Sequence, residues 1–197
     1  MNVFKNTYLI MRHGQSEANV AGVIVSDPDI GCQHFGLTAL GREQASDSVA
    51  AYVDFGITRI VCSDFLRTRE TAAIAAALLD LPQPQIDTGL RERFFGVLEG
   101  QTHEHYQQVW FEDAQGGSPS EHKIESTHQV RQRALEVLRH LDSRFSDECI
   151  LLVSHGDILQ ILRTALVGVA AAQHRSLEHH ETGEIRLLVE RGTHWPE

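Results

Sequence analysis

The chain has 197 residues, of which 42% are hydrophobic and 22% charged, with a formal net charge of −10 at pH 7. This composition is typical of a globular protein that can bury a full core, and it predicts a single domain over residues 1–197. No apolar run reaches the roughly 18 residues of a membrane-spanning helix, and no Lys/Arg cluster offers a nucleic acid a basic face, so we expect neither partner.

Cysteine usage indicates the compartment. Cys32, Cys62 and Cys149 are widely spaced and form no C-x-x-C pair, which suits a reducing compartment better than a disulfide framework. The N-terminal stretch MNVFKNTYLI has a single basic residue, Lys5, and no cleavage-site pattern of a signal peptide. We therefore expect a cytoplasmic protein, and the sequence leaves open whether it forms a homodimer.

The N-terminal part of the chain begins with a short apolar strand over residues 7–13. A polar, Gly-rich loop is expected over residues 14–36, and loops of that length inside a compact domain are often functional. Thr38 has the character of an N-cap, and the helical pattern that follows it ends at Gly56. A second strand is expected over residues 59–63.

The middle of the chain continues this alternation. An Ala/Leu-rich helix is expected over residues 65–79, followed by a weak third strand over residues 83–88. Residues 90–100 mix charges and aromatics with glycines, which is typical of a structured loop. Apolar periodicity predicts an amphipathic helix over residues 102–114 and a longer helix over residues 126–145.

The last part of the chain contains its most strand-like run, residues 149–154. A helix over residues 157–169 and a strand over residues 183–192 follow it. Strands that alternate with helices are typical of an α/β fold. We expect a three-layer α/β/α sandwich whose mostly parallel sheet carries helices on both faces.

Cationic residues stand at the ends of these strands. The first strand ends in Arg12-His13, the strand over residues 149–154 runs into His155, and Arg67 lies about one turn inside the helix after the second strand. Ligands of open α/β sheets bind at the carboxyl ends of the strands. Adjacent cationic groups repel one another, so packing alone explains them poorly, whereas arginines and helix N-termini favour anions. The pattern predicts a phosphate site.

Six blocks of the sequence resemble, in the same order, the motifs of a known family. They are RHGQSEAN (12–19), LTALGREQA (37–45), SDFLRTRETA (63–72), LRERFFGVLEG (90–100), ESTHQVRQRALEVL (125–138) and SHGDILQIL (154–162). Together they cover nearly the whole chain, which is similar to branch 1 of the histidine phosphatase superfamily, the phosphoglycerate mutase-like family. The resemblance implies the phosphoglycerate mutase-like form of the α/β/α sandwich.

The resemblance assigns the chemistry to two residues. His13 would be the nucleophile that attacks phosphorus in line and becomes a phosphohistidine. Glu92 would be the general acid that protonates the leaving oxygen, and then the base that activates water. Glu99 is a nearby competitor for this role, and a salt bridge to Arg91 or Arg93 would reduce Glu92 to a surface residue.

The resemblance also implies a phosphate-binding set. Arg12, Arg67 and His155 would hold the equatorial oxygens and neutralise charge in the transition state. Asn19 would donate a hydrogen bond to the phosphate, and Gln15 would add another. No metal and no other cofactor is expected, because the arginines supply the positive charge.

Some of these residues have competing interpretations. Arg69 competes with Arg67, which would pair with Glu70 if it lay on the helix surface. Gly14 is expected to let the backbone turn close to the anion. The apolar residues at 94–95 and 109–111 either belong to the core or line the pocket of the leaving group.

The twelve histidines raise the question of a metal site. The two close pairs lack the carboxylate or cysteine partners that a zinc site needs. These pairs are His103 with His105 and His179 with His180. We therefore expect no metal.

Membership of the family would leave the reaction open. We expect hydrolysis of a small phosphorylated metabolite by a phosphomonoesterase, because residues 101–126 contain Lys123 as their only lysine or arginine, and a mutase would need more. Gly156 separates His155 from Asp157, unlike in the disulfide-bonded branch 2 acid phosphatases. A cofactor-dependent phosphoglycerate mutase and a non-catalytic phosphoryl-binding module stay open as alternatives.

Overall fold

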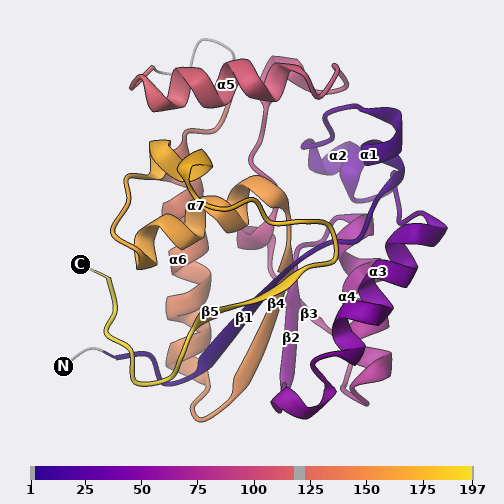
Figure 1. The fold of residues 1–197 in the computed structure, drawn as a ribbon, viewed down its shortest axis with the longest axis vertical. Helices are drawn as coiled ribbons and strands as arrows, with labels where there is room; N and C mark the ends of the chain where they lie inside the picture. The colour runs from indigo at the N-terminus through magenta and orange to yellow at the C-terminus, as the bar shows by residue number, and fades with distance from the viewer. Residues whose placement is uncertain (1–2, 118–122, 197) are drawn as a thin grey trace.

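A five-stranded sheet forms the centre of the protein (Figure 1). The computed structural model describes residues 3–117 and 123–196. The strands lie in the order β3-β2-β4-β1-β5, where β1 to β4 pair in parallel and β5 runs antiparallel to β1. They are β1 (Thr7–Arg12), β2 (Arg59–Cys62), β3 (Gln85–Ile86), β4 (Cys149–Ser154) and β5 (Ile185–Val189). The prediction of a mostly parallel sheet is confirmed.

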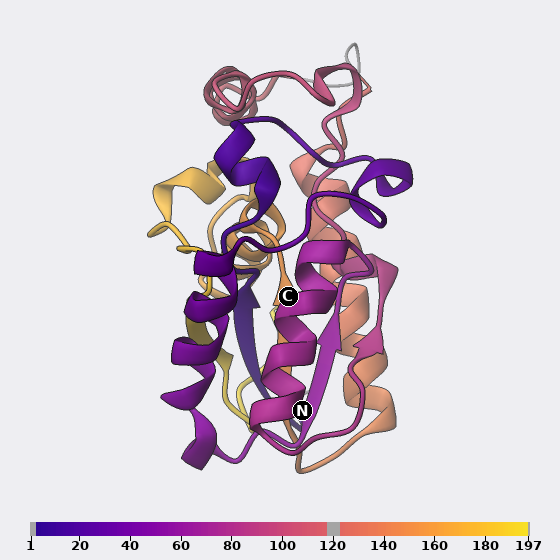
Figure 2. The ribbon, with the colours of Figure 1, turned by 90° about the vertical axis from the view of Figure 1, so that its right-hand side faces the viewer.

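Helices cover both faces of the sheet (Figures 1 and 2). One face carries α3 (Ala39–Ala50) and α4 (Leu66–Leu78), and the other α6 (Thr127–Arg144) and α7 (Gly156–Leu166). Side chains of β1 alternate between these layers, as a strand buried on both faces requires. Tyr8 and Ile10 join the core beneath α6 and α7, whereas Leu9 and Met11 join the core beneath α3 and α4. The three-layer sandwich is therefore confirmed.

Two helices end earlier than the sequence pattern predicts. The pattern extends to Gly56, but α3 ends at Ala50 and a 3₁₀ turn at Val53–Phe55 leads to that glycine, whose φ is 83°. In the same way α7 ends at Leu166, and Gly168 follows with a φ of 70°. Left-handed glycines stop helices, and the apolar residues just before them belong to the turns rather than to the helices.

The prediction that residues 14–36 form only a loop is wrong. They contain α1 (Glu17–Ala21), which begins at Ser16 with a capping box, and α2 (Pro28–Gly31), which begins at Asp27. Side-chain caps offset the poor stability of such short helices. Both helices lie beyond the carboxyl ends of the parallel strands (Figure 1).

The helix α5 (His105–Ala114), which the pattern placed over residues 102–114, lies beyond the same edge of the sheet (Figure 1). Its buried residues Val109 and Asp113 face the rest of the protein. In the part of the chain that the structure describes, no helix combines the length and the hydropathy needed to cross a membrane.

The loop after β1 packs against the beginning of α3 through two glycines. A Cβ at Gly14 would overlap the carbonyl of Gly41, and a Cβ at Gly41 would overlap the carbonyl of Gln15. Gly14 has no left-handed φ, and its N–H donates to Thr71 Oγ1 at 3.2 Å. The structure shows a packing role, because Gly14 lets two backbones touch, and the expected approach of the backbone to an anion stays a prediction.

This contact predicts the sign of a stability change. Helix propensity alone would make Gly41→Ala stabilising by about 1 kcal/mol, but the overlap with the Gln15 carbonyl should make it destabilising by about 1–3 kcal/mol. Urea unfolding of the two proteins measures the difference. Glu43→Ala, at an exposed position of the same helix, is the control and should change stability little. A stabilised Gly41→Ala variant would contradict the close contact.

Candidate active site

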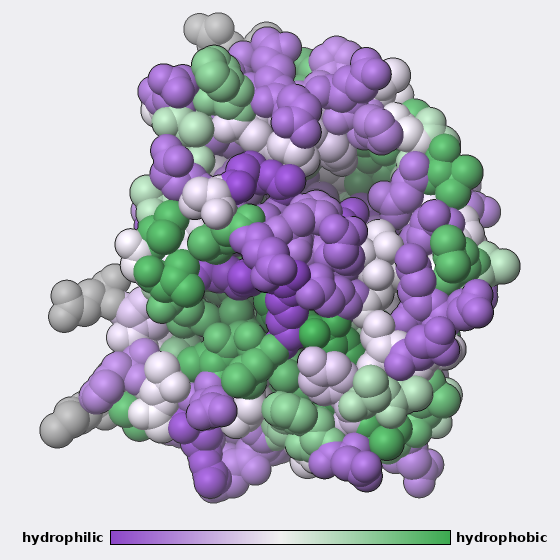
Figure 3. Space-filling model, viewed as in Figure 1, coloured by the Kyte–Doolittle hydropathy of each residue, from purple (hydrophilic) through white to green (hydrophobic). Residues whose placement is uncertain are grey.

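A cavity of about 350 Å³ opens at the carboxyl edge of the sheet, beneath α5. Its volume is at the lower end of the roughly 300–1,000 Å³ typical of small-molecule sites. Hydrophilic residues gather around the hollow in this part of the surface (Figure 3). The end of β1, α1, α4, α5, the start of α7 and residues near 175–179 all contribute to its walls.

His13 follows β1 and is only 3% exposed. Its Nδ1 lies 2.7 Å from the Gly14 carbonyl, to which it donates, so Nε2 carries the lone pair. Arg67 Nε donates to this Nε2 at 3.1 Å. Burial, with the charges of Arg67 and Arg12, holds the pKa of His13 well below its usual range. The imidazole is thus neutral, and its Nε2 carries a lone pair that accepts from Arg67.

Arg67 lies in the first turn of α4 and is 4% exposed. Its Nε also donates to His155 Nδ1 at 3.2 Å, and its Nη2 donates to the Val25 carbonyl at 2.9 Å. Nη1 is buried and has no hydrogen-bond partner among the described residues. Burial lowers the pKa of Arg67. An oxygen anion in the cavity would satisfy this free donor.

The hydrogen bonds of α4 decide between Arg67 and Arg69 as the arginine of the cavity. Glu70 accepts from the backbone of Leu37 and from Arg42, not from Arg67. Arg69 points elsewhere, since its Nη2 donates to the Cys32 carbonyl. Of the two candidate arginines, Arg67 is the one that lines the cavity.

His155 is fully buried behind the wall of the cavity. Besides accepting from Arg67, it places Nε2 3.0 Å from Ser63 Oγ. Its ring meets the ring of His13 edge-on, with centroids 5.3 Å apart. Burial and Arg67 hold the pKa of His155 well below its usual range. His155 therefore supports Arg67 and His13 from behind.

Arg12 brings the second guanidinium to the cavity. Its Nη1 donates to the His180 carbonyl at 2.8 Å and lies 3.1 Å from His179 Nε2. The guanidinium lies against the start of α7, where a Cβ at Gly156 would be 3.5 Å from Arg12 Cζ, an ordinary contact distance. Burial lowers the pKa of Arg12, and no described carboxylate forms a salt bridge with either Arg12 or Arg67. Both guanidinium groups line the cavity, where the negative charge of Glu92 opposes the fall of their pKa.

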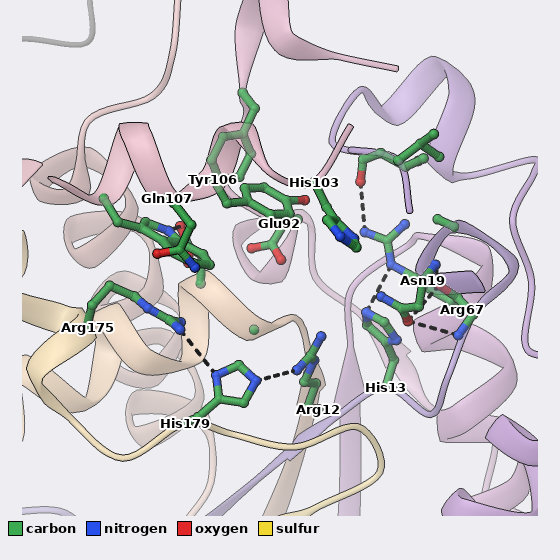
Figure 4. A pocket seen from close by; sticks show the side chains of 18 residues that line it. Arg12, His13, Asn19, Arg67, Glu92, His103, Tyr106, Gln107, Arg175 and His179 are labelled. Atoms are coloured by element: carbon green, nitrogen blue, oxygen red, sulfur yellow. Dashed lines mark hydrogen bonds between the residues drawn. The ribbon is translucent and has the colours of Figure 1, made fainter. Parts of the chain in front are cut away.

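The two predicted amide donors lie in different places. Asn19 lines the cavity, and its Oδ1 accepts from the backbone and hydroxyl of Ser16, so its NH₂ group is free to face the cavity (Figure 4). Gln15 does not line the cavity. Its side-chain oxygen accepts from Thr38 Oγ1 at 2.8 Å, which holds it against the start of α3.

Glu92 is a carboxyl group of the cavity wall, which Arg12 and Arg67 also line (Figure 4). Its Oε1 accepts from the backbone N–H groups of Arg93 at 2.9 Å and of Ile158 at 3.3 Å. Burial, followed by the repulsion of Asp157, raises the pKa of Glu92, while Arg67 and Arg12 oppose this rise. A raised pKa keeps the proton that a general acid must donate.

The competitors of Glu92 have other partners. Glu99 accepts from Ser26 and from the backbone of Asp27. Arg91 and Arg93 form salt bridges of 2.6 Å, but with other acids than Glu92. These acids are Asp64 and Asp113.

Other wall residues were not assigned to the site from the sequence. Arg175 and His179 belong to a segment with no periodicity to mark them, and the sequence distinguishes Asp157 only by its spacing from His155. Tyr106 lies one helical turn before Trp110, and their rings stack with centroids 5.3 Å apart. The one-turn spacing of Tyr106 and Trp110, in the helix that follows the Glu92 motif, is the feature of the sequence that points to this aromatic pair.

The apolar residues proposed for a leaving-group pocket divide between the two interpretations. Phe95 and Trp110 line the cavity. Val109 is buried in a small core cluster and Phe111 is 67% exposed. Phe94 lies outside the cavity. Two of the five therefore line the cavity, and their contact with a leaving group stays a prediction.

No metal centre is formed by the histidine, cysteine and acidic residues that the structure describes. His103 lines the cavity, whereas His105 turns back to Thr102 of its own segment. His179 contacts Arg12, and its neighbour His180 contacts the Glu184 carbonyl. The two close pairs therefore point in different directions.

Known proteins resemble this chain in sequence and in fold. Residues 8–196 match the histidine phosphatase superfamily (branch 1). The glucosyl-3-phosphoglycerate phosphatase of Mycolicibacterium vanbaalenii is 30% identical over 175 residues, 82% of this chain and 74% of that protein. The adenosylcobalamin/alpha-ribazole phosphatase of Salmonella typhimurium is 30% identical over 171 residues, 83% of this chain and 80% of its own.

A solved structure agrees. YhfR of Bacillus stearothermophilus superposes with a TM-score of 0.78 at 27% identity, covering 91% of this chain and 89% of that one. The family match spans all six sequence blocks and all five strands except the first residue of β1. The chain belongs to branch 1 of the histidine phosphatase superfamily.

Proposed function

We propose that this protein is a phosphomonoesterase that hydrolyses a small phosphorylated metabolite through a phosphohistidine at His13. The observation that carries the proposal is the neutral His13, whose unprotonated Nε2 lies 3.1 Å from Arg67 Nε in a cavity that Arg12 and Arg67 also line. Two of its relatives are named as phosphatases of small phosphate esters. The three free cysteines also support the expected cytoplasmic compartment.

In the first half-reaction, Nε2 of His13 attacks the phosphorus and the ester P–O bond breaks. Arg12, Arg67 and the Asn19 amide bind the equatorial oxygens, where guanidinium charge stabilises the transition state. The Gly14 carbonyl, which accepts from Nδ1 at 2.7 Å, stabilises the positive charge that develops on the ring. The proton of Glu92 passes to the leaving oxygen, which departs as an alcohol.

In the second half-reaction, a water molecule replaces the alcohol beside Glu92. The Glu92 carboxylate removes a proton from this water while its oxygen attacks phosphorus, and the P–N bond breaks. Inorganic phosphate leaves, and His13 and Glu92 regain their starting protonation states. One carboxyl group thus serves as acid and then as base.

The first prediction concerns the nucleophile. The protein should hydrolyse p-nitrophenyl phosphate, and His13→Ala should lower this turnover by more than about 10³-fold and abolish an acid-labile phosphoryl label. His140→Ala, at an exposed position of α6, is the matched control and should keep both. Turnover that survives in His13→Ala would exclude His13 as the nucleophile.

The same assay separates the alternatives. Incubation with 3-phosphoglycerate and a trace of 2,3-bisphosphoglycerate should yield inorganic phosphate or no reaction. Isomerisation to 2-phosphoglycerate would favour the mutase. No reaction with any of these compounds, p-nitrophenyl phosphate included, would favour the binding module.

The second prediction concerns pH. Step one needs neutral His13, whose pKa is lowered, and protonated Glu92, whose pKa is raised. Asp157→Asn removes the negative charge that helps to raise the Glu92 pKa, so that pKa should fall. The basic limb of kcat/KM for an alkyl phosphate should then move to lower pH, since its leaving oxygen needs the acid.

A better leaving group provides the control. p-Nitrophenolate departs with little need for a proton, so the basic limb of p-nitrophenyl phosphate hydrolysis should move much less in Asp157→Asn. A thermal melt checks that the variant is folded. An unmoved limb for the alkyl phosphate in a folded Asp157→Asn variant would show that Asp157 does not tune Glu92.

A further inference from the structure

His174 is a fully buried histidine that has no role in the proposed steps. It belongs to the short 3₁₀ segment Ala171–Ser176, which packs against both α5 and α7 (Figure 1). Its Nδ1 lies 3.2 Å from the Ala171 carbonyl, and its Nε2 lies 3.5 Å from Asp157 Oδ1. Among the described residues this Nε2 has no hydrogen-bond partner besides that carboxylate. Both ring nitrogens therefore face an oxygen that accepts.

These contacts decide the protonation state of the His174 ring. A neutral imidazole carries one N–H and leaves the other nitrogen with a lone pair. That lone pair would face either the Ala171 carbonyl or the Asp157 carboxylate, with no donor to meet it. A buried acceptor without a donor is unfavourable. An imidazolium instead donates to Ala171 from Nδ1 and pairs with Asp157 through Nε2, so the contacts favour the positively charged ring.

The charges around Asp157 favour the same state. Arg93 is fully buried, donates to the two oxygens of Asp113 at 2.6 and 2.9 Å, and lies 3.6 Å from Asp157 Oδ2. With an imidazolium at His174, this buried cluster holds two cations and two carboxylates. With a neutral ring it would hold one carboxylate in excess, and an unpaired buried charge is strongly destabilising.

Asp157 acts on Glu92, the proposed acid, which lines the same cavity. Burial, followed by the repulsion of Asp157, raises the pKa of Glu92. Burial opposes the ionisation of Asp157 too, but its contacts with His174, Arg93 and Trp110 prevail and lower its pKa. Two acids that repel each other hold one proton between them more firmly than a second. The partners of Asp157 therefore leave that proton on Glu92.

Other charged or titratable groups near the two acids do not replace His174. They are Arg12, Arg67, Tyr106 and Arg175. The first two arginines lower the pKa of Glu92 and so oppose its protonation. Burial and both acids raise the pKa of the tyrosine, which stays neutral. Arg175 forms no salt bridge with Asp157 in the part of the chain that the structure describes.

We infer that His174 is a buried imidazolium that acts as a positioning residue, because it keeps Asp157 ionised and thereby assigns the proton shared by two neighbouring acids to Glu92. The inference rests on the proposed role of Glu92 as general acid. His174 does not line the cavity, so it acts through Asp157 and not on the substrate. A segment that follows α7 thus determines which of two carboxyl groups protonates the leaving oxygen.

The ring nitrogens of His174 report on this state directly. Nuclear magnetic resonance of the intact protein, labelled with ¹⁵N in its histidine rings and assigned from neighbouring residues, should show a hydrogen on both nitrogens of His174 at pH 7. A bare nitrogen in this ring would overturn the inference. This measurement uses the wild-type protein, so it holds even where a variant fails to fold.

Two substrates with different leaving groups show whether His174 acts through the acid. Glycerol 3-phosphate has a leaving oxygen that needs a proton, and His174→Gln should lower its kcat/KM by about 10-fold, a part of the roughly 10²–10⁴-fold that general acid–base catalysis contributes. The kcat/KM of p-nitrophenyl phosphate should change little. The basic limb for glycerol 3-phosphate should move to higher pH, because the loss of a nearby cation makes it harder to ionise both acids.

Matched variants provide the controls. His128→Gln, at an exposed position of α6, should leave both substrates unaffected. In the Asp157→Asn background, His174→Gln should cause no further selective loss for glycerol 3-phosphate, since the carboxylate through which it acts is gone. An equal loss for both substrates in His174→Gln, or a selective loss that persists without Asp157, would overturn the inference.

The same measurements separate this inference from the proposed function. If the wild-type protein hydrolyses p-nitrophenyl phosphate through His13 while the His174 ring is neutral, only the role of His174 is wrong. If the wild-type protein hydrolyses neither substrate, the proposed function fails, and the role of His174 fails with it.

Discussion

The site depends on arginines that are held in place without carboxylate partners. Arg67 is fixed by two histidines, by the Val25 carbonyl and by the ring of Phe65, with 4.9 Å from Cζ to the ring centroid. Arg12 is fixed by the His180 carbonyl. Neutral partners orient a guanidinium without cancelling its charge. The desolvated charge costs stability in the free protein, and an anion that binds it returns that stability by mass action.

The same charges control protonation at the nucleophile. Arg67 and Arg12 lower the pKa of His13, and burial acts in the same direction. A protonated His13 would have no lone pair for phosphorus, so in the proposed reaction the arginines that would bind the phosphate also help to keep the His13 ring neutral. On the opposite wall two acids repel each other. Burial opposes the ionisation of Asp157, but its contacts with His174, Arg93 and Trp110 prevail and lower its pKa, while the pKa of Glu92 is raised.

The sequence predicted the residues that regular elements position. His13, His155 and Arg67 follow the carboxyl ends of strands that lie side by side, so their meeting is a consequence of parallel pairing. Glu92 could be chosen only from its motif, because its rival Glu99 differs from it in partners, Ser26 and Asp27, that lie far away in sequence. Gln15 follows the same motif, yet Thr38 holds its side chain away from the cavity.

Residues in irregular segments could not be predicted in this way. No apolar periodicity in the sequence predicts where Arg175 or His179 lie. Their positions depend on tertiary contacts with Gln160, Trp110 and Arg12. The roles of glycines were equally hidden, because Gly14 is required by the backbone of Gly41 across the loop and not by its own φ. Local sequence patterns predict backbone conformation, whereas the positions of these residues depend on contacts with residues that are distant in sequence.

Trp110 connects two charged side chains of the cavity wall, Arg175 and Asp157. Its ring supports Arg175, and its Nε1 donates to Asp157 Oδ2 at 3.0 Å. Asp157 in turn helps to raise the pKa of Glu92. The same indole therefore holds both Arg175 and Asp157. One side chain of α5 links a cation of the cavity wall to the acid beside Glu92, which explains why a helix outside the sandwich contributes to the cavity.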